Sequence, residues 1–182
     1  MRFLLTCFML CFSSVLFASD IAGVYAIPSK DDESYVEIFQ KNGKFYGVGF
    51  ANKSGKDSGN DVKNPDPKLR DRKVGGSVFL WNLTYNKEDN EYHNGKLYNF
   101  QNGTTYHVSA EWDNGKLKVR VSKDKKGVFG KTLVWRKMSE KEIAPYQAKR
   151  PNIESLQLPK WQIYEIAISR LESTLYMFFA VL

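Results

Sequence analysis

Residues 104–122, TTYHVSAEWDNGKLKVRVS, decide the fold of this chain. Apolar and polar side chains alternate before Asp113-Asn114-Gly115, and they alternate again after it. This period of two is typical of strands with one buried face, and Asn-Gly supplies the positive φ angles of a tight hairpin turn. The stretch therefore predicts an antiparallel hairpin. Its buried face is predicted to carry Tyr106, Val108, Ala110, Trp112, Leu117, Val119 and Val121.

The same strand-and-turn pattern recurs over the preceding residues and once more after the hairpin. A closed antiparallel sheet hides all its edges, and at eight strands its interior is just wide enough for side chains or one small ligand. We therefore predict an all-β fold, an eight-stranded antiparallel barrel. Its strands are expected at Ala22–Ile27, Ser34–Gln40, Phe45–Ala51, Ser77–Tyr85, Tyr92–Tyr98, Thr104–Trp112, Lys116–Ser122 and Phe129–Arg136.

The first residues have the layout of a secretory signal peptide. A short basic start precedes an apolar run over 3–17, and small and polar residues follow from Ala18. We predict a signal peptide at residues 1–18, a barrel domain at 19–137, and a periplasmic or secreted location. A retained anchor is the alternative. Cleavage would remove both Cys7 and Cys11, so the exported domain would have no disulfide and would depend on its core for stability.

Residues 138–182 form a C-terminal extension of a different kind, predicted to be partly helical. Its first part is charged and suits a short helix, and Trp161–Leu182 is apolar with roughly helical spacing. Charges in the middle of this second part argue against a membrane span. The alternatives are a helix packed on the barrel or over its mouth, a helix that contacts a membrane surface or protein partner, and a tail foreign to the native gene product.

The charge of the chain is moderately basic, at +7. Such a charge favours solubility or attraction to anionic partners. No recognition helix or RNA-binding motif is present, so a nucleic-acid partner is not expected. The two histidines, His93 and His107, have no nucleophile at a recognisable spacing, and His107 falls on the outward face of its strand. We expect no enzyme activity, no cofactor and no metal.

Two groups of residues are candidates for a ligand-binding site. The first is a stiff polar loop with two Asn/Asp-Pro steps, whose alternative role is to satisfy its own backbone and charges. The second is a set of aromatic residues that either line a ligand cavity or simply pack the core. In this second group, Phe79, Trp81, Leu83 and Tyr85 are predicted to share one strand face. The candidates are Asp61, Asn64, Asp66 and Arg70 in the loop, and Tyr35, Tyr46, Trp81, Tyr85, Tyr98, Tyr106 and Trp112 among the aromatics.

Several motifs make residues 22–137 resemble a bacterial family of small exported proteins classed as a domain of unknown function, which is similar to lipocalins and other calycins in fold. The motifs are Gly23-Val24-Tyr25, Asp61 with Asn64–Arg72 and Gly75-Gly76, Asn94–Asn99, Gly103–Tyr106 and Gly130–Arg136. The resemblance implies a calycin barrel that binds a small apolar or amphipathic molecule. It also implies that Tyr25 lies under Arg136 at the base of the barrel, with Tyr in place of the family's Trp.

The function predicted from the sequence is that of an exported lipocalin-like protein that binds a small hydrophobic or amphipathic ligand without catalysis. The alternative is an interaction protein with a filled barrel. In that case its basic face or its C-terminal helix would engage a membrane surface or a protein partner.

Overall fold

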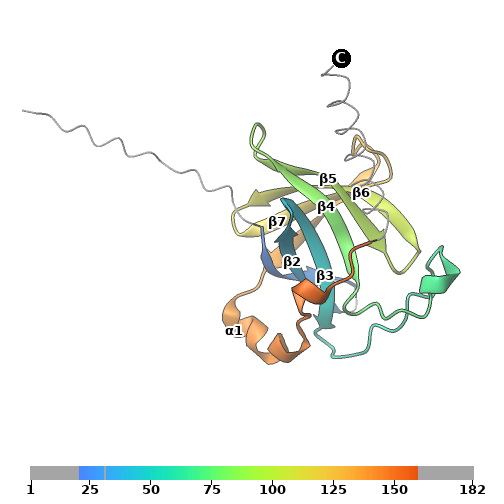
Figure 1. Ribbon diagram of the computed structural model, residues 1–182. Coiled ribbons are helices and arrows are strands. Elements are labelled where there is room, and N and C mark those ends of the chain that lie inside the picture. Colours follow the sequence, from blue (N-terminus) through green and yellow to red (C-terminus); the bar gives the residue numbers. More distant parts are fainter. Residues whose placement is uncertain (1–20, 31, 160–182) are drawn as a thin grey trace, which may run out of the picture.

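The computed structural model describes residues 21–30 and 32–159, and within these residues eight antiparallel strands close into a barrel (Figure 1). Each strand pairs with the next along the chain, and the last pairs with the first. The predicted barrel is confirmed, and the expected strand bounds agree with the observed ones to within one residue. The strands are β1 Gly23–Pro28, β2 Glu33–Lys41, β3 Lys44–Asn52, β4 Val78–Asn86, β5 Glu91–Asn99, β6 Thr104–Asp113, β7 Lys116–Ser122 and β8 Gly130–Lys137.

The two Asn-Gly hairpins form as predicted. Asn42 and Gly43 have φ angles of 52° and 73°, and Asn114 and Gly115 have φ angles of 46° and 81°. Positive φ at both central residues defines the type I′ turn, whose twist matches that of the flanking strands. These turns therefore fix the register of β2 with β3 and of β6 with β7.

The two ends of the barrel differ in their connections, because alternate connections of an up-and-down barrel lie at the same end. We call the end with short turns the closed end and the other the open end. The closed end has the turns at residues 42–43, 87–90 and 114–115. The open end has the loops at residues 29–32, 53–77, 100–103 and 123–129, and the longest of these contains the 3-10 helix η1 Pro67–Leu69.

A single apolar cluster fills the lumen and receives side chains from all eight strands. Its largest members are Tyr25, Tyr92 and Trp135, each at most 1% exposed. Burial of such rings accounts for much of the stability of a chain whose described part has no cysteine. The other buried members are Ile21, Val36, Ile38, Phe45, Leu80, Leu83, Val108, Ala110, Leu117 and Val119.

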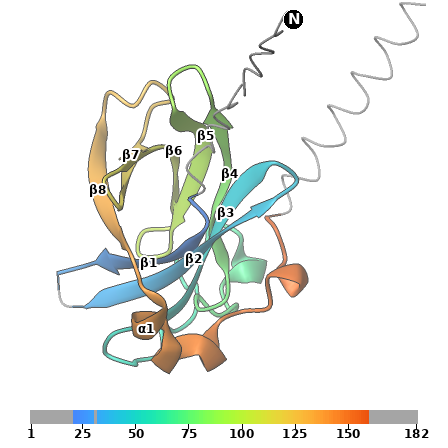
Figure 2. The ribbon, with the colours of Figure 1, turned by 90° about the vertical axis from the view of Figure 1, so that its left-hand side faces the viewer.

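Residues 138–159 run along the outside of the barrel. They contain α1 Glu140–Ile143, η2 Ala144–Lys149 and η3 Ile153–Ser155, and Figure 2 shows α1 and the following turns below β1 and β2. Met138 and Ile143 join an outer apolar cluster on β1–β3. A second outer cluster, on β2–β5, packs against apolar residues at and after η3. The segment thus gives part of the barrel a second apolar layer.

A buried ion pair fastens this segment to β2. Glu37 is 5% exposed and accepts hydrogen bonds from Nε and Nη2 of Arg150, at 3.0 and 2.5 Å. The hydrogen bond to Glu37 raises the pKa of Arg150 above its usual value. Because both carboxylate oxygens are engaged, the pair has the two-point geometry that favours arginine over lysine.

The predictions for residues 1–18 and for Trp161–Leu182 fall on residues outside the described part of the chain, and they stay predictions. Within the described part, no helix has the length and apolar character needed to cross a membrane.

Candidate functional site

The closed end of the barrel is plugged by side chains. Ile21 is fully buried in the luminal cluster, and its carbonyl accepts a hydrogen bond of 2.8 Å from the Tyr25 hydroxyl. The rings of Trp112 and Tyr25 form a T-shaped pair with a centroid distance of 6.4 Å. Lys137 Nζ lies 5.4 Å from the centroid of Trp112 and donates to the Ala22 carbonyl at 2.9 Å. A cation over an aromatic face contributes about 0.5–2 kcal/mol, so this contact stabilises the packing at the closed end.

The cation at this base differs from the one that the family resemblance implies. The register pairs Tyr25 with Lys137 and Ala26 with Arg136. Because successive side chains alternate across a strand, Arg136 faces outward, where its Nη1 donates to Glu142 at 2.7 Å. The expectation that Arg136 covers Tyr25 is therefore wrong, and Lys137 supplies the cation instead, over Trp112.

At the open end, apolar side chains gather around Trp135 and pack on the luminal cluster, and we call this group the cup. Trp135 lies deeper and forms its floor, with its ring 6.2 Å from that of Phe79. The indole N–H of Trp135 is buried and has no hydrogen-bond acceptor among the described residues. Tyr106 lies at the rim, opposite Leu97 in the register of β5 with β6. The wall consists of partly exposed side chains that pack on the luminal cluster, namely Ile27, Phe79, Leu97, Val121 and Leu133.

Two apolar side chains stand exposed beside the cup, on the loop between β7 and β8. Val128 is 65% exposed and Phe129 is 77% exposed. The loop is held in shape by Asp124, whose carboxylate accepts from the backbone N–H groups of both residues at 2.9 and 2.7 Å. Arg120 Nε donates to the Gly127 carbonyl at 2.7 Å. These bonds fix the loop in a conformation that presents two apolar groups to solvent.

The seven aromatic residues predicted to line a ligand cavity do not lie together. Tyr85 and Trp112 pack against the luminal cluster toward the closed end, and Tyr106 lies at the open end. The other four, Tyr35, Tyr46, Trp81 and Tyr98, belong to the two outer clusters. Most of the predicted set therefore forms the outer layer of the barrel wall.

A backbone irregularity in β4 explains why Trp81 is not in the lumen. Strict alternation predicts that Trp81 and Leu83 share a face, but Asn82 between them has a φ of 60°. A residue in the left-handed region inside a strand shifts the alternation as a β-bulge does. Leu83 consequently points into the lumen and Trp81 into the outer cluster of β2–β5. The prediction that Phe79, Trp81, Leu83 and Tyr85 share one face is wrong for Trp81.

The polar loop is organised around Asp61, which is fully buried. Its carboxylate accepts from Asn64 Nδ2 at 2.5 Å, from Arg72 Nε at 2.9 Å and from the Tyr98 hydroxyl at 2.9 Å. The Arg72 guanidinium also lies over the rings of Tyr98 and Phe100, at 5.7 and 5.6 Å from their centroids. Burial, followed by the hydrogen bond to Asp61, raises the pKa of Tyr98 to about 12.

The remaining loop candidates also bond within the loop. Asp66 caps η1 by accepting from the Lys68 N–H at 3.0 Å, and Arg70 Nε donates to the Asn64 carbonyl at 2.9 Å. The loop packs closely on the β5–β6 turn, where Gly103 has a φ of 70° and a Cβ would approach the Lys63 carbonyl oxygen to 2.1 Å. This geometry matches the self-satisfied loop that the sequence left open as the alternative to a binding site.

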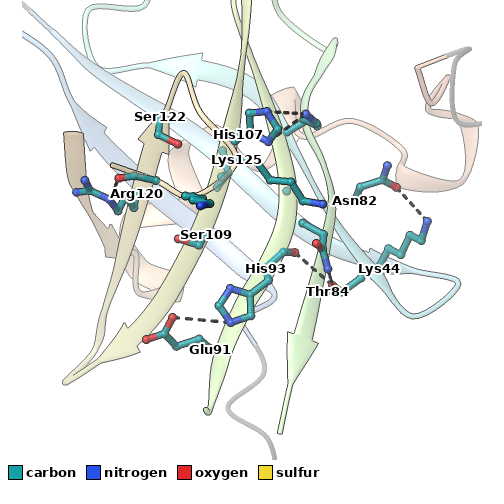
Figure 3. Close-up of a pocket in the computed structure, with 16 residues that line it drawn as sticks. Lys44, Asn82, Thr84, Glu91, His93, His107, Ser109, Arg120, Ser122 and Lys125 are labelled. Carbon is teal, nitrogen blue, oxygen red and sulfur yellow. Dashed lines mark hydrogen bonds and ion pairs between the residues drawn. The ribbon is translucent and has the colours of Figure 1, made fainter. Parts of the chain in front are cut away.

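A polar groove runs along the outer face of the barrel over β4–β7, with a volume of about 860 Å³ (Figure 3). His107 lines it, in agreement with its predicted outward orientation. The sequence predicted a basic face of the barrel, as part of the alternative function, but no groove. The alternation of Lys118, Arg120 and Ser122 indicates a polar outer face on β7. Nothing in the sequence shows that His93 and Lys96 of β5 line the same groove.

Three side chains at one edge of this groove could offer metal ligands. One donor atom each from Asp89, Glu91 and His93 lies within 4.8 Å of the others. His93 Nε2 already makes a 2.8 Å hydrogen bond with Asp89, and the carboxylates are substantially exposed. The hydrogen bond between His93 and Asp89 explains why these side chains lie close together, so we do not assign a metal site to them.

The closed eight-stranded barrel, with its plugged base and its apolar open end, defines a protein of the lipocalin class. The chain belongs to the bacterial family described as "Uncharacterized protein conserved in bacteria (DUF2147)", whose profile matches residues 23–137. It is similar to a solved structure, protein HP1028 from the human pathogen Helicobacter pylori, which is described as belonging to the lipocalin family. The two are 37% identical with a TM-score of 0.69, and the match covers 74% of this chain and 94% of HP1028. A comparison with curated proteins gave no match.

Proposed function

We propose that this protein binds a small hydrophobic or amphipathic molecule in the open end of its barrel, without catalysis, after export to the periplasm or the exterior. The observation that carries the proposal is the difference between the two ends. Ile21, Tyr25 and Trp112 pack together at the base, while the opposite end has a set of partly exposed apolar side chains. Ligand sites in small barrels are concave and mostly apolar, with few polar groups.

The buried N–H of Trp135 at the floor of the cup favours an amphipathic ligand over a purely apolar one. A buried N–H without an acceptor costs about 1–3 kcal/mol, and Trp135 places one such N–H in the lumen. A carboxylate, carbonyl or hydroxyl oxygen on the ligand would supply the acceptor once the ligand displaces the side chains that cover this N–H. The exposed Val128 and Phe129 beside the cup provide further apolar surface for the part of a ligand that projects from the barrel.

The test fills the cup with a larger side chain. Leu133 faces the cup, whereas its neighbour Val134 on β8 is 46% exposed on the outer face. Leu133→Trp is therefore expected to weaken binding of the fluorescent fatty acid cis-parinaric acid by about tenfold, the loss of roughly one buried side chain's contact. Val134→Trp, which adds the same ring outside, is the matched control.

The measurement is a fluorescence titration of the intact protein and of both variants, with thermal unfolding recorded for each. Binding by the native protein and by Val134→Trp, with weak binding by Leu133→Trp, supports a luminal site. Equal affinities in all three would place the probe elsewhere on the protein. No binding by the native protein of either the fatty acid or an uncharged apolar dye would refute the proposal.

A further inference from the structure

The outer groove over β4–β7 collects positive charge from four separate parts of the chain. Lys44 comes from β3, Lys96 from β5, Arg120 from β7, and Lys125 and Lys126 from the β7–β8 loop. Figure 3 shows Lys44 and Arg120 on opposite sides of the groove, with His93 between them. Glu91 is the carboxylate that lines the same groove. The groove is therefore strongly cationic over its length.

None of these five cations has a carboxylate within ion-pair distance among the described residues. On the same outer face of β7, for comparison, Lys118 lies 2.8 Å from Asp113. Lys44 donates to the neutral amide oxygen of Asn82 at 3.2 Å, and Arg120 donates to carbonyls of the β7–β8 loop. Gathering unpaired like charges in a concave surface is unfavourable unless an anion offsets them.

Lys96 and His107 lie together in the wall of the groove. Lys96 Nζ lies 3.2 Å from Nδ1 and 3.3 Å from Nε2 of His107. Burial, followed by the charge of Lys96, lowers the pKa of His107, while Asp124 opposes that shift. The lowered pKa favours the neutral imidazole of His107, which adds no positive charge to the groove. The ammonium of Lys96 has three donors, so it can bond an anion and the imidazole together.

We propose that this groove binds a small anion that carries several phosphoryl charges. Lysines act as point charges toward phosphate, and charge-assisted bonds to phosphate oxygens are stronger than neutral ones. The volume of about 860 Å³ exceeds what one phosphate needs and lies in the range of small-molecule pockets. The spread of the cations from β3 to the β7–β8 loop suits a ligand with more than one charged group. The site is separate from the apolar cup and does not depend on it.

The experiment uses the whole protein and two probes of the same chemistry. Sodium tripolyphosphate, followed by calorimetry at low salt, represents a free phosphorylated molecule. Vesicles of phosphatidylcholine with phosphatidylglycerol, followed by co-sedimentation, represent a lipid headgroup. Lys125→Gln/Lys126→Gln removes two groove charges. Lys116→Gln/Lys118→Gln removes two charges from outer positions of β7 that do not line the groove.

We expect the native protein to bind at least one probe, and the Lys125/Lys126 variant to bind it about tenfold more weakly, as the loss of charge-assisted bonds predicts. The control variant should bind within about twofold of the native protein, because neither lysine lines the groove and Lys118 is already offset by Asp113. The probe that binds identifies the source of the phosphate.

An independent readout is the titration of His107 by NMR. An anion beside Lys96 must raise the pKa of His107, because it offsets the neighbouring positive charge. Absence of binding to both probes, or equal losses in the groove and control variants, would overturn the proposal. The latter result would mean that general basic charge, not the groove, attracts the anion.

Discussion

The buried carboxylate of Asp61 is predicted to be a main structural support of the long loop. Asp61→Ala would leave the Arg72 guanidinium, the Tyr98 hydroxyl and the Asn64 amide without their shared acceptor. Removing one partner of a buried ion pair costs about 3–5 kcal/mol, because the other is left uncompensated. Asp61 is fully buried and the Arg72 side chain is 32% exposed, so the loss should lie toward the lower part of that range.

The expected change is measurable by thermal and urea unfolding. For a domain of this size, 1 kcal/mol corresponds to about 2–4 °C in Tm, so Asp61→Ala should lower Tm by about 6–12 °C. Asp71→Ala is the matched control, because Asp71 is an exposed carboxylate next to Arg72 in the same loop. Its effect should stay within about 0.5 kcal/mol.

A gentler variant separates the network from the packing around it. Tyr98→Phe removes one hydrogen bond to Asp61 and keeps the ring in its outer cluster. It should cost about 1 kcal/mol, and the loop should remain ordered, because Arg72 and Asn64 still hold the carboxylate. If Asp61→Ala were as stable as Asp71→Ala and instead lost binding of the fatty-acid probe, the reasoning would be refuted. Asp61 would then be a ligand-binding group, as the sequence first suggested.

Two further predictions concern the C-terminal segment. Arg150→Met would leave Glu37, which is 5% exposed, without its ion partner, so we expect a loss of about 3 kcal/mol in urea unfolding, with the exposed neighbour Lys149→Met unchanged as control. Hydrogen bonds from the Ser139 backbone and hydroxyl and from Arg136 lower the pKa of Glu142 from 4.5 to about 2. The native protein should therefore lose stability as the pH falls from about 4.5 toward 2, and Glu142→Gln should flatten this part of the acid unfolding profile; an identical profile would contradict the prediction.

Short-range sequence signals predicted the strands and turns well, because each depends on neighbouring residues. The positive φ angles at Asn42 and Asn114 follow from the Asn-Gly pairs, and the alternation in β6 correctly assigned Val108 and Ala110 to the lumen. The alternation rule failed for Trp81, because Asn82 adopts a left-handed conformation that is set by the folded sheet and not by its neighbours in sequence. An isolated Asn within a strand pattern does not by itself predict a bulge.

Sequence patterns could not predict the tertiary contacts that decide the role of each polar candidate. Asp61 bonds to Tyr98, which is 37 residues away, and Glu37 pairs with Arg150 across 113 residues. A loop that concentrates Asp, Asn and Arg was open to two interpretations, a binding site or a self-satisfied loop. Its charges are matched to one another, and this matching is visible only when the register of the barrel brings Tyr98 beside the loop.

The aromatic content of the chain gives a misleading picture of the lumen for a related physical reason. A barrel wall has two faces, and here the outer face of β1–β5 is also apolar, because residues 138–159 cover much of it. Four of the seven predicted lining residues belong to that covered layer. What distinguishes a candidate binding surface is therefore not the presence of rings but the absence of a covering element among the described residues. By that criterion two surfaces remain, the apolar cup at the open end and the cationic groove over β4–β7. They differ strongly in polarity, so an uncharged apolar dye tests the cup and tripolyphosphate tests the groove.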